Sequence, residues 1–180
     1  MLYSASVPVY LRYLERLEGL VTEAEQFAAA SGRSEQAMLQ ARLAADMLPF
    51  AAQVAIAANF ALRACYPLAG RAVPPFAGIP ESFEALQRQV ALVRGRVGAL
   101  QASEFKGTEA RVLRETAGDG DLKLPAWEFL LHFALPNFFF HFTSAYAILR
   151  SLGARIGKAH FDGWHSYRDG SPVNSPSRTD

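Results

Sequence analysis

The feature that most constrains the fold is a long uncharged stretch in the last third of the chain. Between Glu128 and Arg150 it reads FLLHFALPNFFFHFTSAYAIL, with no acidic or basic residue apart from two histidines. A helix that is apolar on every side has to be covered by other elements. Residues 127–150 therefore predict a central helix, which Pro136 interrupts because it lacks an N–H group.

Three further segments have the spacing of amphipathic helices that could cover it. Residues 4–30 carry apolar side chains at steps of three and four. Residues 47–68 are rich in alanine, with Pro49 placed in the first turn, and residues 81–100 have a regular apolar seam. Residues 34–44 are expected to be a short helical or irregular connector.

Residues 105–124 change character and predict a small β-hairpin. Val112 and Leu113 are followed by the turn sequence AGDGD and then by LKLP. The sequence therefore predicts an all-α, up-and-down four-helix bundle with a β-hairpin before the last helix. We expect residues 1–162 to form this one domain and residues 163–180 to be a polar, mobile tail.

Composition excludes several classes of function. A net charge of +1 with no basic block argues against nucleic-acid binding. The single cysteine, Cys65, rules out an intramolecular disulfide, and no signal peptide is apparent at the start, so we expect a cytoplasmic protein. Residues 129–149 are about as long as the roughly 20 residues of a membrane span, but two histidines, an asparagine and a proline near their centre predict a buried helix.

Polar residues on the central helix indicate where a site could lie. Asn137, His141 and Ser144 follow one another at steps of four and three and so share one stripe. We expect Gln53, and Asp46 near it, to face this stripe from the second helix. His141 is then either a buried histidine bonded to Asn137 or Gln53, or a residue that contacts a ligand.

His132 lies nine residues before His141, about 180° around a straight helix, so the two rings are not expected to converge on one ion. A bend at Pro136 would relax this geometry without reversing it. A metal site would therefore use His141 as its anchor, with Asp46 or His132 brought in, and Zn²⁺ or Ni²⁺ as the metal.

The order of the segments and the stretch LLHFALPNFFFHFTSAYAILRSLG resemble the DinB/YfiT-like superfamily of four-helix bundles. The segments SASVPVYLRYLERL and DMLPFAAQV are most similar to a branch known only as a domain of unknown function. The resemblance covers about residues 2–160 and implies the bundle fold and the position of a pocket.

The resemblance also implies what has changed in the site. Better-known members bind a divalent metal through one histidine on the second helix and an HxxxH pair on the last, and some are thiol-dependent transferases or isomerases. On this chain the HxxxH pair corresponds to Asn137 and His141, and the second-helix histidine falls near Gln53. Amides thus replace two of the three ligands.

Three hypotheses follow. The first is a DinB-like protein that binds a small molecule at Gln53, Asn137, His141 and Ser144, with the metal site degenerate. The second is a divalent-metal-dependent, thiol-linked transferase or hydrolase with a modified site. The third is a non-enzymatic homodimer that buries the aromatic excess of the last helix against a second copy.

Overall fold

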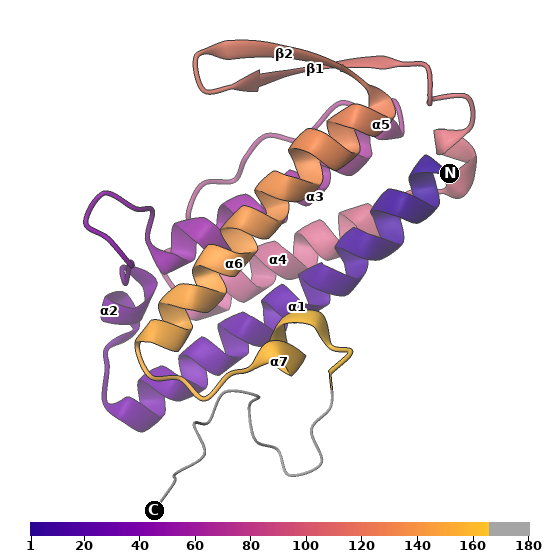
Figure 1. Cartoon of the computed structure of the whole chain (residues 1–180). Helices are drawn as coiled ribbons and strands as arrows, with labels where there is room; N and C mark the ends of the chain where they lie inside the picture. Colours follow the sequence, from indigo (N-terminus) through magenta and orange to yellow (C-terminus); the bar gives the residue numbers. More distant parts are fainter. Residues whose placement is uncertain (166–180) are drawn as a thin grey trace, which may run out of the picture.

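Four long helices pack into an up-and-down bundle in the computed structural model, which describes residues 1–165 (Figure 1). Part of the predicted tail, residues 166–180, lies outside the described residues. The bundle helices are α1 (Leu2–Ser31), α3 (Phe50–Leu68), α4 (Phe83–Gly98) and α6 (Leu135–Ser151). Helices α3 and α6 pack closely together, α1 packs along α4, and the predicted all-α bundle is confirmed.

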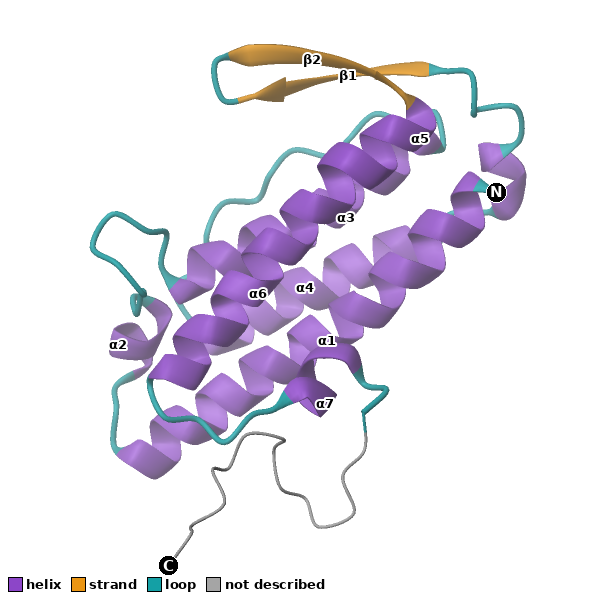
Figure 2. Cartoon of the chain, in the orientation of Figure 1, coloured by secondary structure: helices purple, strands orange, loops and turns teal. Residues whose placement is uncertain are grey.

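Short elements join the long helices (Figure 2). Helix α2 (Glu35–Leu39) begins after Ser34, whose hydroxyl accepts a hydrogen bond from the N–H of Ala37 at 3.2 Å. The 3₁₀ turn η1 (Ala102–Phe105) follows α4, and α7 (Lys158–Asp162) follows α6. The sequence did not predict η1 or α7, because turns this short carry no helical periodicity.

Helix α3 begins at Phe50, three residues later than the sequence predicted. Pro49 is the residue before the helix, with an extended backbone (φ −72°, ψ 166°). A proline disfavours the helical conformation for the residue before it, so Met47 and Leu48 stay in the preceding loop. Most of the alanines of α3 are fully buried, which brings its backbone close to α6 and α4.

The predicted hairpin is confirmed as strands β1 (Val112–Ala117) and β2 (Gly120–Pro125). They pair antiparallel, with Arg114 opposite Lys123. The turn consists of Gly118, at φ 61°, and Asp119, and a glycine in the first central position suits a two-residue hairpin turn. The hairpin lies across the end of the bundle where α5 begins (Figure 1).

The central helix has three parts. It starts as α5 (Ala126–Glu128), widens into the π-helical turn η2 (Phe129–Ala134), and continues as α6. The π-helical turn lies directly before Pro136. Pro136 has no N–H to donate to the carbonyl of His132, and its ring would crowd that carbonyl in a regular helix. The interruption expected at Pro136 therefore takes the form of a wider turn.

The core lies between α6 and the other three long helices. Phe138 is fully buried and meets the ring of Tyr10 on α1 edge to face, with 5.1 Å between centroids. Phe142, one turn on, stacks on Phe161 of α7 at 4.5 Å. Among residues 1–165, no helix is both long and apolar enough to cross a membrane.

Candidate functional site

His141 and Gln53 join α6 to α3 at the centre of the candidate site. The Nδ1 atom of His141 lies 2.7 Å from Oε1 of Gln53, and the Gln53 side chain is 2% exposed. The Nε2 atom of Gln53 donates to the carbonyl of Leu48 at 3.2 Å. The loop before α3 thus fixes the amide with its oxygen toward the imidazole.

This arrangement sets the tautomer of the imidazole. An amide oxygen only accepts, so Nδ1 of His141 carries the proton and the neutral ring keeps a lone pair on Nε2. No residue among 1–165 forms a hydrogen bond with Nε2. Among residues 1–165, the hydroxyl of Tyr10 is the one solvent-shielded side-chain oxygen or nitrogen that lacks a hydrogen-bond partner. Nε2 of His141 also lacks a partner but is not shielded, so it reaches solvent.

The ring of His141 is held between aromatic and cationic neighbours. It stacks on Phe60 of α3 at 5.7 Å between centroids and meets Phe140 edge to face at 5.2 Å. The guanidinium of Arg63 lies 4.4 Å over the ring of Phe60. Burial, and then the positive charge of Arg63, lower the pKa of His141, so the imidazole is neutral at pH 7.

Asn137 and Ser144 share a stripe with His141 but have different surroundings. The Nδ2 atom of Asn137 donates to the carbonyl of Phe133 at 2.8 Å, which satisfies a backbone oxygen of the π-helical turn. Ser144 is 8% exposed and lines a hollow on the surface. Asn137 therefore supports the helix, while Ser144 reaches a space that a ligand could fill.

The hollow is shallow and open to solvent, lies between α6 and the loop that precedes α3, and has a volume of about 480 Å³. Its lining residues are uncharged and mostly apolar: Leu43, Phe139, Phe140, Thr143, Ser144 and Ala147. His141 is not among them, but Phe140 both lines the hollow and contacts the edge of the His141 ring. The histidine–glutamine pair thus adjoins the hollow through one aromatic side chain.

The structure does not gather the three candidate metal ligands. Asp46 lies exposed in the loop before α3, and His132 lies exposed on η2, with its ring 5.6 Å from that of Trp127. Among residues 1–165, no three His, Cys, Asp or Glu side chains are grouped as a metal site would require.

The donor set around His141 does not fit the metal that the resemblance implies. Zn²⁺ takes histidine, cysteine or carboxylate ligands, and the residues standing in for the second and third histidines are amides. Both amides are also engaged, Gln53 with His141 and Asn137 with Phe133. We therefore derive no metal-dependent step from this site.

Three residues near the site were not predicted from the sequence. Phe60 and Leu43 lie beside His141 and the hollow, and their spacing is that of ordinary helix and loop residues. Arg63 did carry a signal, since it is the one charged side chain within the alanine-rich helix α3.

Comparisons with known proteins agree with this architecture. A family model described as "Domain of unknown function (DUF1993)" matches residues 2–162. The crystal structure of a DinB family member protein from Shewanella denitrificans superposes with a TM-score of 0.81 and 28% sequence identity, covering 93% of this chain and 95% of that one. No curated protein matches this chain.

Proposed function

The chain belongs to the DUF1993 family, a DinB-like branch of unknown function, and we propose that it binds a small, largely apolar molecule in the hollow beside α6. The observation that carries this proposal is the hollow of about 480 Å³ adjoining the His141–Gln53 pair. Ligand sites of roughly 300–1,000 Å³ with mostly apolar walls and a few polar groups are common in proteins.

Each candidate residue then has a distinct role. Ser144 contributes a hydroxyl at the wall, while His141 does not line the hollow and adjoins it only through Phe140. Gln53 holds the imidazole in its tautomer, and Asn137 supports the turn before α6. A ligand with an apolar body and a hydroxyl, thiol or amine donor matches this set better than a charged one, because none of the lining side chains is charged.

The experiment uses 1-anilinonaphthalene-8-sulfonate, an aromatic fluorescent probe, titrated into the full chain. Ala147→Trp places a large ring in the hollow and is expected to reduce probe binding at least tenfold. Ala91→Trp is the control, because Ala91 is an exposed alanine on α4 away from the hollow. Equal binding by wild type and Ala147→Trp, or an equal loss in Ala91→Trp, would contradict the proposal.

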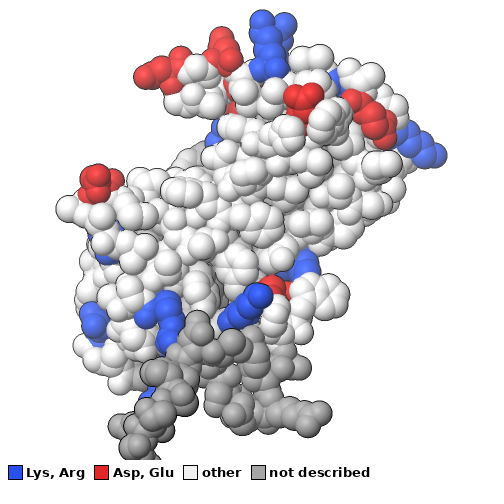
Figure 3. All heavy atoms as spheres, viewed as in Figure 1, with Lys and Arg blue, Asp and Glu red and all other residues white. Residues whose placement is uncertain are grey.

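A second candidate function is self-association through exposed apolar side chains of the central helix. Trp127 of α5, Leu131 of η2 and Phe140 of α6 are 47%, 48% and 59% exposed. Figure 3 shows that the charged side chains lie mainly toward the edges of the face in view. Since large apolar patches commonly mark protein interfaces, we propose a homodimer as the alternative to ligand binding.

Light scattering at increasing protein concentration tests this alternative. Leu131→Lys puts a charge on the face without touching the hollow, and it is expected to leave a monomer if wild type dimerises there. A wild-type monomer at high micromolar concentration, or a dimer that Leu131→Lys leaves unchanged, would remove the candidate.

A further inference from the structure

The hairpin has two sheet edges, and they differ in what occupies them. β1 and β2 form a two-stranded sheet within the described chain, so each strand has one edge without a neighbouring strand. On the β1 edge, the N–H of Thr116 donates to the carboxylate of Glu115 at 3.1 Å, and the carbonyl of Thr116 accepts from Arg63 at 3.3 Å. Side chains therefore already occupy the edge of β1 at Thr116.

The edge of β2 is open. Ala117 and Gly120 flank the two-residue turn and form its hydrogen-bonded pair. Along an antiparallel hairpin, such pairs alternate with pairs whose backbone N–H and C=O groups point away from the partner strand. The bonds of Thr116 to side chains match this alternation. On β2, the outward groups belong to Asp121 and Lys123, and no residue among 1–165 forms a hydrogen bond with them.

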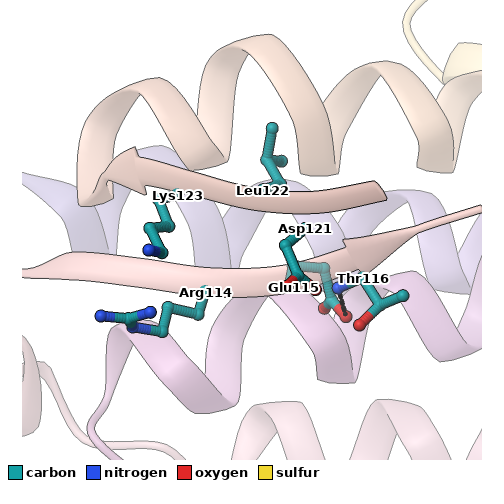
Figure 4. A pocket seen from close by; sticks show the side chains of 6 residues that line it. All are labelled: Arg114, Glu115, Thr116, Asp121, Leu122 and Lys123. Carbon is teal, nitrogen blue, oxygen red and sulfur yellow. Dashed lines mark hydrogen bonds between the residues drawn. The ribbon is translucent and has the colours of Figure 1, made fainter. Parts of the chain in front are cut away.

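Lys123 also has an unfavourable partner inside the hairpin. It lies directly opposite Arg114, and Figure 4 shows the two cationic side chains next to each other. Like charges opposite one another destabilise an antiparallel pair. Asp121, two residues away on the same face, is separated from Lys123 along the strand. A neighbouring strand with a carboxylate opposite Lys123 would offset the repulsion.

We propose that the open edge of β2 pairs antiparallel with β2 of a second copy of this chain, with Leu122 of both copies at a two-fold axis. Each Asp121 then lies opposite Lys123 of the other copy, and each such pair exchanges both of its outward backbone hydrogen bonds. The result is a four-stranded sheet with two ion pairs across its centre.

Charge selects this register over its neighbours. A symmetric pairing that joins outward groups can centre on Asp121, Leu122 or Lys123. Centring on Asp121 opposes two carboxylates, and centring on Lys123 opposes two ammonium groups. Only the Leu122-centred register places opposite charges together at both positions. An edge lysine alone commonly guards against pairing, but here the aspartate at i−2 makes the edge self-complementary.

The rest of the fold is compatible with this dimer. A two-fold axis through Leu122 is perpendicular to the sheet, so the β1 strands lie at its two far edges. Arg63 ties β1 to α3, which keeps each bundle on the outer side of its own hairpin. A single strand pair is a small interface, so we expect a dissociation constant of roughly micromolar or weaker.

The test measures the dissociation constant of the full chain by analytical ultracentrifugation. Lys123→Asp opposes two pairs of carboxylates and is expected to weaken the dimer roughly tenfold or more. The same change places Asp at position 123 opposite Arg114, so it does not weaken the hairpin itself. Arg88→Asp, at an exposed position of α4, changes the net charge by the same amount and is the matched control, expected to leave the dimer intact. The double variant Asp121→Lys, Lys123→Asp swaps both charges and is expected to restore it.

A second measurement fixes the register. Leu122→Cys brings two thiols together at the axis, in a pair without backbone hydrogen bonds where the Cα atoms are about 4.5 Å apart, and is expected to cross-link under mild oxidation. Gly120→Cys, away from the axis, is expected not to. The native Cys65 is fully buried and does not compete.

The proposed β2 pairing does not rest on ligand binding. The variants that test ligand binding, Ala147→Trp and Ala91→Trp, lie outside the hairpin, so the two proposals can fail separately. A wild-type monomer at several hundred micromolar would overturn the β2 pairing. So would a dimer unaffected by Lys123→Asp. A dimer lost in Leu131→Lys but kept in Lys123→Asp would also overturn it and would assign the interface to the central helix.

Discussion

The imidazole of His141 and the amide of Gln53 form one hydrogen-bonded unit across the interface of α6 and α3, with 2.7 Å between Nδ1 and Oε1. Where the resemblance implies two metal ligands, this chain has a donor and an acceptor that satisfy each other. The lone pair that a metal would need is left on Nε2, and within residues 1–165 no three His, Cys, Asp or Glu side chains are grouped as a metal site would require.

The first prediction concerns stability and pH. The pKa of His141 is lowered in the folded protein by burial and then by Arg63, so between that pKa and about 6.5 the unfolded chain binds more protons. The contribution of His141 to stability is therefore complete above about pH 6.5 and is lost as pH falls through the folded pKa. Urea unfolding of His141→Gln is expected to give a shallower pH dependence than wild type between pH 7 and 5. An identical slope in both would contradict this.

The second prediction concerns Gln53. Gln53→Leu leaves the Nδ1–H of His141 and the carbonyl of Leu48 without their partners, and it is expected to cost about 1–3 kcal/mol of unfolding free energy. Gln53→Glu keeps the acceptor and adds a negative charge, so the pKa of His141 is expected to rise above its wild-type value. An NMR titration of the imidazole measures it. No rise in Gln53→Glu would mean that the pair is not formed in solution.

The third prediction concerns metal. Protein purified without a histidine tag is expected to contain far less than one equivalent of Zn²⁺ or Ni²⁺, and added metal is expected to leave its melting temperature unchanged. The reason is that one histidine with two engaged amides is a poor ligand set. Elemental analysis of wild type and His141→Ala checks this. Near-stoichiometric metal that disappears in His141→Ala would instead support the metal-dependent alternative.

Apolar spacing predicted the helices at 4–30 and 81–100, apolar runs predicted the helix at 47–68 and the central helix, and a turn sequence predicted the hairpin. The sequence pattern could not place the start of α3, since Pro49 reads equally well inside a first turn and just before it. Nor could it predict the π-helical turn η2, because an added residue per turn leaves no clear mark in a sequence that is apolar at every position but His132. Boundaries thus depended on backbone details that side-chain patterns do not encode.

The candidate site was less predictable than the fold. Helical spacing put Asn137, His141 and Ser144 on one stripe, but a stripe says nothing about what each side chain faces. Asn137 turns to the carbonyl of Phe133, and Ser144 to the hollow. The sequence also paired Asp46 with the stripe, yet the loop before α3 leaves it exposed. Whether these residues bind a ligand stays a prediction.

The fourth prediction compares two neighbouring phenylalanines. Phe138 is fully buried against Tyr10, whereas Phe140 is 59% exposed. Phe138→Ala removes a ring from a packed core and is expected to cost about 3–5 kcal/mol, while Phe140→Ala is expected to cost about 1 kcal/mol or less. Urea unfolding of both variants measures the difference. Similar losses would mean that the outer face of α6 is covered in solution, as in the proposed α6 homodimer.

The fifth prediction concerns the link between hairpin and bundle. Arg63 of α3 pairs with the carboxylate of Glu115 and donates to the carbonyl of Thr116, and both charged side chains are largely buried. Arg63→Ala removes both bonds, and a two-stranded hairpin is only marginally stable without support. Hydrogen exchange over residues 112–125 is expected to become faster, while the unfolding free energy of the bundle falls by only about 1 kcal/mol.

Arg88→Ala is the control for this variant, because Arg88 pairs with Glu84 at the surface of α4, with 68% and 75% of the two side chains exposed. Its exchange pattern over the hairpin is expected to match wild type. Unchanged exchange in Arg63→Ala would show that apolar contacts such as the buried Leu113 hold the hairpin by themselves. Faster exchange would make Arg63 the residue that fixes β1 on the bundle.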